Sequence, residues 1–158
     1  MTLRAVKLPE GVAGSLWLGA MPGRFESWNA FEAQARQSDL GVVVCLTPRE
    51  ELAELSPLYH AAIDEGGLPF RWINLPMPNF GLPADPVIFR REVQQIAAAL
   101  RQGDAVMLHC AAGIGRTGST AACVLKALGL DTAQALKRIR DAGSNPQNAQ
   151  QSGLVDWF

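Results

Sequence analysis

The chain has 158 residues, of which 48% are hydrophobic and 18% are charged, and its formal net charge is −1. This length predicts one domain spanning residues 1–158, and the composition argues against disorder, which requires low hydrophobicity and high charge. The near-neutral charge argues against a nucleic-acid-binding or membrane-surface protein. No apolar run is long enough for a membrane-spanning helix, and the broken apolar pattern near the N-terminus is not typical of a signal peptide.

The predicted elements alternate between strands and helices. In chain order they are a strand at 15–20, a helix capped by Ser27, a strand at 42–46, a helix begun by the capping box Thr47-Pro48-Arg49-Glu50, a helix from Ser56-Pro57 to Glu65, a strand at 70–75, a proline-rich loop at 76–86, a helix from Asp85 to Arg101, a strand at 105–109, a glycine-rich loop, and helices at 116–128, 131–142 and from Asn145-Pro146 onward. This alternation predicts an α/β fold with a mainly parallel central sheet and helices on both faces. In such folds the reactive loop lies beyond the carboxyl end of a central strand.

Cysteine and histidine usage indicates the compartment. Three cysteines are an odd number and too few for a disulfide scaffold. With two histidines and no Cys-x-x-Cys pair, a zinc site is not expected. We therefore expect a cytoplasmic protein that binds no metal. We also expect Cys123 to be a core residue.

The loop that follows the 105–109 strand carries the clearest chemistry. Its sequence is His109-Cys110-Ala111-Ala112-Gly113-Ile114-Gly115-Arg116-Thr117. The glycines allow the backbone to wrap so that its N–H groups face inward at the start of a helix, which creates a cradle for an anion. Arg116 can return over this cradle and hold two phosphate oxygens. The predicted phosphate-binding residues are Ala111, Ala112, Gly113, Ile114, Gly115 and Arg116.

The same loop supplies a nucleophile. The positive field of the cradle favours the thiolate of Cys110, and a thiolate beside a bound phosphate is placed to attack phosphorus and form a cysteinyl phosphate. The hydroxyl of Thr117 can donate to the sulfur and stabilise it as the leaving group of the second step. We predict that Cys110, Arg116 and Thr117 are catalytic.

These residues resemble a known signature. Segment 109–117 is similar to the His-Cys-x5-Arg-Ser/Thr motif of the cysteine-dependent protein tyrosine phosphatases. The chain from about Leu16 to Phe158 resembles the small dual-specificity phosphatases, most of all the kinase-associated phosphatase type. Further likenesses are the strand that ends in Cys45, the acid-containing helix after it, and a Gln-x-x-x-Gln segment at 147–151.

The resemblance implies a phosphatase that acts on phosphorylated proteins or peptides and needs no cofactor. Because 158 residues cannot include the substrate-recognition loop of the larger tyrosine-specific enzymes, it also implies a shallow site that admits phosphoserine and phosphothreonine. The loop lacks the lysines of the phosphoinositide phosphatases in this superfamily, which argues against a highly anionic inositol lipid. Another phosphate ester as substrate, or a pseudophosphatase that binds phosphorylated partners, remains an open alternative.

One position departs from the family pattern. The resemblance places a general-acid Asp in a Pro-x-x-Asp context, which in this chain ends in Asn79. In one interpretation Asp85 acts as the acid instead, although it also suits a helix N-cap before Pro86. In a second, the enzyme works without a dedicated acid and loses roughly 100- to 10,000-fold on poor leaving groups. In a third, Asn79 is a trap substitution or marks a module that binds phosphate and rarely turns over.

The resemblance also implies supporting roles. Gln147 and Gln151 resemble glutamines that position the hydrolytic water, with the polar face of a helix as the alternative. His109 is expected to orient the loop by hydrogen bonds. Cys45 is a candidate for a reversible disulfide with Cys110, with a small buried hydrophobe as the alternative. Glu50, Glu51 and Glu54 are most simply interpreted, with Arg49, as a solvated helix face; the resemblance also implies that one of these acids pairs with Arg116, and the sequence does not choose which.

Overall fold

In the computed structural model, which describes residues 3–158, five strands form one sheet with the order β1-β2-β5-β3-β4. The strands are β1 (Arg4–Val6), β2 (Ser15–Gly19), β3 (Val42–Cys45), β4 (Arg71–Asn74) and β5 (Ala105–His109). β1 pairs antiparallel with β2, and the other neighbours pair in parallel. The predicted mainly parallel sheet is confirmed, and its central strand is β5.

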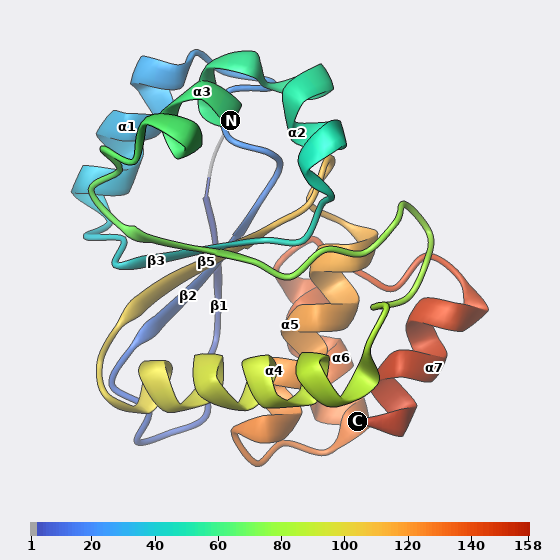
Figure 1. Ribbon diagram of the computed structural model, residues 1–158. Helices are drawn as coiled ribbons and strands as arrows, with labels where there is room; N and C mark the ends of the chain where they lie inside the picture. The colour runs from blue at the N-terminus through green and yellow to red at the C-terminus, as the bar shows by residue number, and fades with distance from the viewer. Residues whose placement is uncertain (1–2) are drawn as a thin grey trace.

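Helices cover both faces of this sheet, as predicted. They are α1 (Trp28–Gln37), α2 (Arg49–Leu55), α3 (Pro57–Glu65), α4 (Pro86–Arg101), α5 (Gly115–Ala127), α6 (Thr132–Asp141) and α7 (Ala149–Trp157). Figure 1 shows α1, α2 and α3 on one face and α4 to α7 on the other. Among the described residues, no helix combines the length and hydropathy needed to cross a bilayer.

The alternation of side chains along the strands divides the core into two layers. Because successive residues of a strand point to opposite faces, Val44 and Leu108 join the larger core that includes residues of α4 and α5. Val43 and Met107 instead pack with Phe31 of α1. Burial on both faces explains why β3 and β5 are short, continuous apolar runs in the sequence.

Helix α5 is the helix that positions the loop after β5. Every residue from Gly115 to Leu125 is buried, so the helix lies inside the domain. A side chain at Gly118 would place its Cβ 2.6 Å from the backbone nitrogen of Asn145, so glycine allows the segment before α7 to approach closely. The start of α5 is therefore fixed directly behind the loop.

Three sequence predictions are corrected. The strand β1 was not predicted, because three residues at a sheet edge give too short a pattern to detect. No capping box begins α2: Pro48 occupies the N-cap position, and the hydroxyl of Thr47 lies 3.2 Å from the sulfur of Cys45 instead. The last helix begins at Ala149 rather than at Asn145, because Asn148 supplies the cap.

Candidate active site

A cavity of about 430 Å³ lies beyond the carboxyl end of β5. Part of its lining is the loop that follows β5 and the start of α5, and the remainder comes from segments far apart in the sequence. The lining residues are Arg24, Glu51, Leu55, Asn79, Phe80, Cys110, Ala111, Ala112, Gly115, Arg116 and Gln147. The fold therefore brings the predicted nucleophile, the predicted arginine and the substituted acid position to one place.

Cys110 follows the last residue of β5 and is only 3% exposed. Its sulfur accepts a hydrogen bond from the hydroxyl of Thr117 at 3.1 Å and another from the backbone N–H of Gly113 at 3.2 Å. Thr117 lies in the first turn of α5 and is fully buried. Two donors aimed at one sulfur stabilise negative charge on it, as a nucleophile and later leaving group requires.

The carbonyl groups of the loop are held by donors from its surroundings. The carbonyl of Ala111 accepts from Nη1 of Arg24 at 3.0 Å and from the N–H of Met21 at 3.3 Å. The carbonyl of Ile114 accepts from the N–H of Asn145 at 3.2 Å. Arg24 is a site residue that the sequence analysis missed, since nothing in the sequence around it marks contact with the loop.

Gly113 is the residue where the loop turns most sharply. Its φ is +78°, and an added Cβ would lie 2.5 Å from the backbone of Gly19 at the end of β2, so only glycine fits. Its carbonyl accepts from Nη2 of Arg4 and from the hydroxyl of Ser144, each at 2.6 Å. The sequence analysis missed both donors, which come from opposite ends of the chain.

Holding these carbonyls also sets the direction of the amides. In a trans peptide the C=O and the following N–H point in opposite directions, so fixing the carbonyls of Ala111 and Ile114 fixes the N–H groups of Ala112 and Gly115. Both of these residues line the cavity. Because they lie at the N-terminal end of α5, their N–H groups and the helix dipole together favour a bound anion.

Arg116 is 3% exposed, and its guanidinium is held at the side of the cavity. Nη2 donates to Oε2 of Glu51 at 2.8 Å, and Nη1 donates to Oε1 of Glu51 at 3.3 Å and to the carbonyl of Met77 at 3.0 Å. The bidentate pair fixes the plane of the guanidinium. The structure thus identifies Glu51 as the acid that pairs with Arg116, a choice that the sequence left open.

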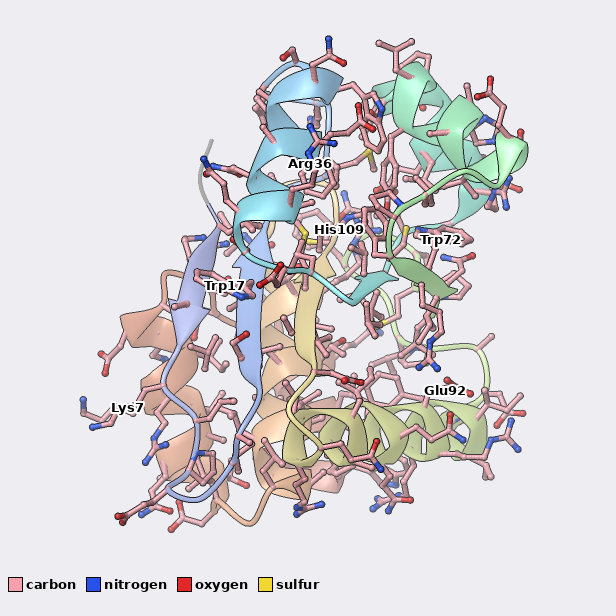
Figure 2. The ribbon with its side chains drawn as sticks, turned by 90° about the vertical axis from the view of Figure 1, so that its left-hand side faces the viewer. Lys7, Trp17, Arg36, Trp72, Glu92 and His109 are labelled. Atoms are coloured by element: carbon pink, nitrogen blue, oxygen red, sulfur yellow. The ribbon has the colours of Figure 1, made fainter. Side chains whose placement is uncertain are left out.

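His109 belongs to a buried hydrogen-bond chain behind the nucleophile. Nδ1 of His109 lies 3.0 Å from the carbonyl of Cys110 and must donate to it, so Nε2 accepts from the hydroxyl of Tyr59 at 2.8 Å. Tyr59 in turn accepts from Nε1 of Trp72 at 2.9 Å. In Figure 2 the labelled Trp72 and His109 lie at a similar height in the central part of the molecule.

Burial keeps His109 neutral. Burial is the main cause that lowers the pKa of His109 from 6.5 to about 4, and the charge of Arg116 lowers it further. A neutral imidazole with both nitrogens engaged orients the loop, as predicted, and has no free nitrogen to act as a base. The sequence analysis missed Tyr59 and Trp72 because each looked like an ordinary aromatic core residue.

The two candidates for the acid position lie in different surroundings. Asn79 is exposed and lines the cavity. Asp85 does not line the cavity, and its Oδ1 accepts from the N–H groups of Val87 and Ile88 at 2.9 and 3.2 Å. The interpretation of Asp85 as the N-cap of α4 is confirmed. Among the described residues that line the cavity, Glu51 is the one carboxylate, and it is paired with Arg116.

Both predicted glutamines lie against the start of α5. A Cβ at Gly115 would meet Oε1 of Gln147 at 2.5 Å and Oε1 of Gln151 at 2.8 Å. The N–H of Gln147 donates to Oε1 of Gln151 at 2.7 Å, and Gln151 is only 1% exposed. Of the two, Gln147 lines the cavity. The structure therefore brings both amides to the loop, Gln151 as a buried residue and Gln147 as an exposed residue that precedes α7.

Cys45 is close to the loop in the sheet but is a buried thiol. Its backbone pairs with His109, and its sulfur lies 3.2 Å from the hydroxyl of Thr47. Burial raises the pKa of Cys45 to about 11. Cys45 and Cys110 belong to different hydrophobic clusters, so a disulfide between them stays a hypothesis. Cys123 is fully buried in the core, as predicted.

Comparison with known families connects this geometry to a known group of proteins. The family described as "Polymorphic toxin system, DSP-PTPase phosphatase" matches residues 21–129, which include the loop, Glu51 and Asn79. The chain belongs to this family. The match covers the greater part of the chain, and the DSP-PTPase relationship agrees with the resemblance seen in the phosphate-binding loop.

Individual relatives of this chain agree with the family. The chain is 32% identical over 109 residues to a protein of Invertebrate iridescent virus 3 that is named as a tyrosine phosphatase, covering 67% of this chain and 42% of the viral protein. It is 45% identical over 56 residues to tyrosine-protein phosphatase 1 of Caenorhabditis elegans, covering 31% of this chain. The chain thus spans 42% and 5% of the lengths of these two relatives.

The fold of this chain is shared with a solved structure of kinase-associated phosphatase in which the catalytic-site cysteine is replaced by serine. The TM-score is 0.84 at 19% sequence identity, and the alignment covers 98% of this chain and 92% of the other. At this identity the likeness shows the fold. The overall architecture predicted from the sequence is therefore confirmed by comparison as well.

Proposed function

We propose that this DSP-PTPase chain hydrolyses phosphate monoesters on phosphoproteins through a cysteinyl-phosphate intermediate. The observation that carries the proposal is the sulfur of Cys110, which receives donors from Thr117 and Gly113 at a cavity that Arg116 also lines. A thiolate, an anion cradle and a guanidinium in one cavity are the parts that phosphoryl transfer to a cysteine requires.

In the first step the thiolate of Cys110 attacks phosphorus while the bond between phosphorus and the ester oxygen breaks. The electron pair of that bond leaves with the oxygen, which then takes a proton. Arg116 and the N–H groups of residues 111–116 would hold the three other phosphoryl oxygens, where negative charge is spread in the transition state.

In the second step water attacks the phosphorus of cysteinyl phosphate. The new bond to oxygen forms while the bond to sulfur breaks, and phosphate and the thiolate are released. The hydroxyl of Thr117 would donate to the departing sulfur, to which it already donates at 3.1 Å. Gln147, which lines the cavity, would orient the water with the support of Gln151.

Protonation of the leaving oxygen is the part of the reaction that the residues of the cavity support least. Asn79 occupies the position of the usual acid, and the Glu51 carboxylate is bound to Arg116. We therefore expect the reaction to depend strongly on the leaving group, so that aryl phosphates such as phosphotyrosine react much faster than the alkyl esters of phosphoserine and phosphothreonine.

Asn79 also favours a second candidate function, in which the chain binds a phosphorylated partner and rarely turns it over. The cradle and Arg116 would be retained for binding in that case, whereas release of the alcohol would be slow. The two functions differ in turnover and not in affinity for phosphate, so a kinetic measurement separates them.

The test is a rapid-mix assay with an aryl phosphate, with Cys110→Ser as the control. An initial burst of the aryl alcohol equal to the enzyme concentration, absent from Cys110→Ser, would support the phosphatase. Binding of a phosphotyrosine peptide without any release of phosphate would instead support the binding function. Hydrolysis of nucleotide or sugar phosphates in preference to phosphopeptides would replace the protein substrate with a small one.

A cytoplasmic location is part of the same proposal. Cys45, Cys110 and Cys123 are free thiols, which suits a reducing compartment. A nucleophilic thiolate is also open to oxidation, and it would keep its activity best where cellular thiols keep it reduced.

A further inference from the structure

The carbonyl of Gly113 is the point where both ends of the chain meet the phosphate-binding loop. Arg4 in β1 donates to it through Nη2, and Ser144, after α6, donates to it through its hydroxyl, each at 2.6 Å. Nη1 of Arg4 also donates to Oγ of Ser144 at 3.0 Å and to the carbonyl of Ala142 at 2.6 Å. One guanidinium therefore joins the N-terminal strand, the end of α6 and the loop.

The surroundings of Arg4 leave room for this arrangement and favour its charge. Gly143 has a φ of +87°, and a Cβ at this position would lie 2.8 Å from Nη1 of Arg4. Ala142 is the C-cap of α6, where the helix dipole favours a cation. Ser144 is only 1% exposed, so its hydroxyl depends on these partners for its hydrogen bonds.

The charge of Arg4 also acts on the nucleophile. Burial lowers the pKa of Arg4, and the negative charge of Cys110 raises it, so the two groups interact electrostatically. The guanidinium remains protonated at physiological pH because its ordinary pKa is so high. Arg4 thus places a positive charge at the loop without being one of the residues that line the cavity.

We propose that Arg4 and Ser144 are positioning residues that hold the Gly113 carbonyl and thereby orient the N–H of Ile114 toward the transferring phosphoryl group. The inference rests on the proposed phosphatase function. Its physical basis is the planar trans peptide between Gly113 and Ile114, in which a carbonyl pulled to one side directs the N–H to the other. An amide that is already oriented stabilises the transition state without reorganisation during the reaction.

The experiment compares Arg4→Met and Ser144→Ala with the wild type in two assays, steady-state hydrolysis of an aryl phosphate and calorimetric titration with tungstate, a phosphate-like oxyanion. We expect Arg4→Met to lower kcat by about 10- to 100-fold, with a smaller change in KM, and to weaken tungstate binding. Ser144→Ala should have the same effects to a smaller degree, because Arg4 still holds the carbonyl. Arg4→Lys should recover part of the loss.

Arg138→Met is the matched control. Arg138 of α6 donates to the carbonyl of Lys7 at 3.0 Å, so it also ties the segment after β1 to α6, but it does not contact the loop. Its loss should leave kcat and the tungstate dissociation constant unchanged. A purely structural role for Arg4 would lower the amount of folded enzyme without changing the dissociation constant of the folded fraction.

Each result decides for or against the inference. Unchanged kcat and tungstate binding in Arg4→Met, or losses no larger than those of Arg138→Met, would overturn it. If Arg4→Met does not fold, Ser144→Ala decides by the same two readouts. If the wild type shows no turnover, the proposed function fails, and tungstate titration of Arg4→Met and Ser144→Ala still decides whether these residues position the loop.

Discussion

The nucleophile side and the leaving-group side of the cavity differ in burial and in hydrogen bonding. On the nucleophile side Cys110, Arg116 and Thr117 are buried, and each has hydrogen-bond partners within the fold. On the leaving-group side Asn79 and Phe80 are exposed, and Phe80 has a left-handed backbone with a φ of 60°. The comparison indicates that binding of phosphate and attack by the thiolate are well supported, whereas protonation of the leaving oxygen is not.

The loop at 76–86 has only a few attachments to the remainder of the domain. The N–H of Met77 donates to the carbonyl of Leu46 at 3.0 Å, the carbonyl of Met77 accepts from Nη1 of Arg116 at 3.0 Å, and Nδ2 of Asn148 donates to the carbonyl of Phe80 at 3.0 Å. Few contacts and an exposed backbone are features of segments that open at low free-energy cost. The leaving-group side is therefore expected to open more easily than the nucleophile side.

Among the substitutions that test this comparison, replacement of Arg116 should have the largest effect on activity. Arg116→Lys keeps a positive charge but loses the planar fork that pairs with Glu51 and would pair with phosphate. We expect kcat/KM for an aryl phosphate to fall by about 100- to 1,000-fold. Steady-state kinetics measures this loss.

Arg49→Lys is the control for that substitution, because Arg49 lies on the exposed side of α2 and pairs with Asp64 away from the cavity. It should leave kcat/KM within a factor of about two, as expected for a surface substitution. Equal losses of kcat/KM in Arg116→Lys and Arg49→Lys would show that the guanidinium of Arg116 has no special role.

Lowering the pH should lower the free energy of unfolding of the protein through His109. The folded protein keeps this histidine neutral down to a pH of about 4, whereas the unfolded chain binds a proton near pH 6.5. The stabilisation is therefore complete above pH 6.5 and is lost as the pH falls toward 4, with a size on the order of 3 kcal/mol. Urea unfolding across this pH range measures it.

His109→Asn removes the titrating group and keeps a donor for the carbonyl of Cys110. Its free energy of unfolding should vary less between pH 6.5 and 4 than that of the wild type. If His109→Asn loses stability with acid as steeply as the wild type, the buried neutral histidine is not the cause.

Restoring a carboxylic acid on the leaving-group side should raise the rate. We expect Asn79→Asp to increase hydrolysis of a phosphoserine peptide by up to about 100-fold, and hydrolysis of an aryl phosphate with a good leaving group by much less. The difference arises because a poor leaving group depends more strongly than a good one on protonation of its oxygen. Rates with a series of esters of increasing leaving-group pKa measure it.

Asp85→Asn is the matched variant, since asparagine caps a helix about as well as aspartate and cannot act as an acid. We expect its rates and pH profile to equal those of the wild type. A large loss in Asp85→Asn would instead identify Asp85 as the general acid and would contradict its assignment as a cap alone.

The smallest predicted effect concerns the cap itself. Asp85→Ala removes the acceptor for the N–H groups of Val87 and Ile88 and should lower the free energy of unfolding by about 1 kcal/mol. Thermal unfolding measures it, with Asp85→Asn expected to retain nearly all of the stability. Equal loss in both variants would mean that the carboxylate contributes by its charge and not by capping.

The parts of this site that the sequence predicted are the local ones. Cys110, Arg116 and Thr117 lie on one strand, loop and helix, and their spacing alone brings them together. Burial on both faces made β3 and β5 visible as short apolar runs, and Asp85 was recognisable as a cap from Pro86 after it. These signals depend on neighbours in the chain, which a sequence displays directly.

The parts that the sequence did not predict depend on distant contacts. Arg4 and Ser144 reach one carbonyl from opposite ends of the chain, and Tyr59 meets His109 only because α3 packs over the sheet. The choice of Glu51 as the partner of Arg116 likewise depends on which face α2 turns to the cavity. No local pattern encodes such contacts, because any surface arginine, core tyrosine or helical glutamate looks the same in the sequence.

The account rests on a covalent bond between Cys110 and phosphorus. The most direct measurement is the intact mass of the protein after rapid acid quenching during turnover of an aryl phosphate, followed by peptide mapping. We predict one added phosphoryl group on the peptide that contains Cys110, and none in Cys110→Ser. Product release without any phosphorylated Cys110 peptide, or equal release by Cys110→Ser, would contradict the mechanism.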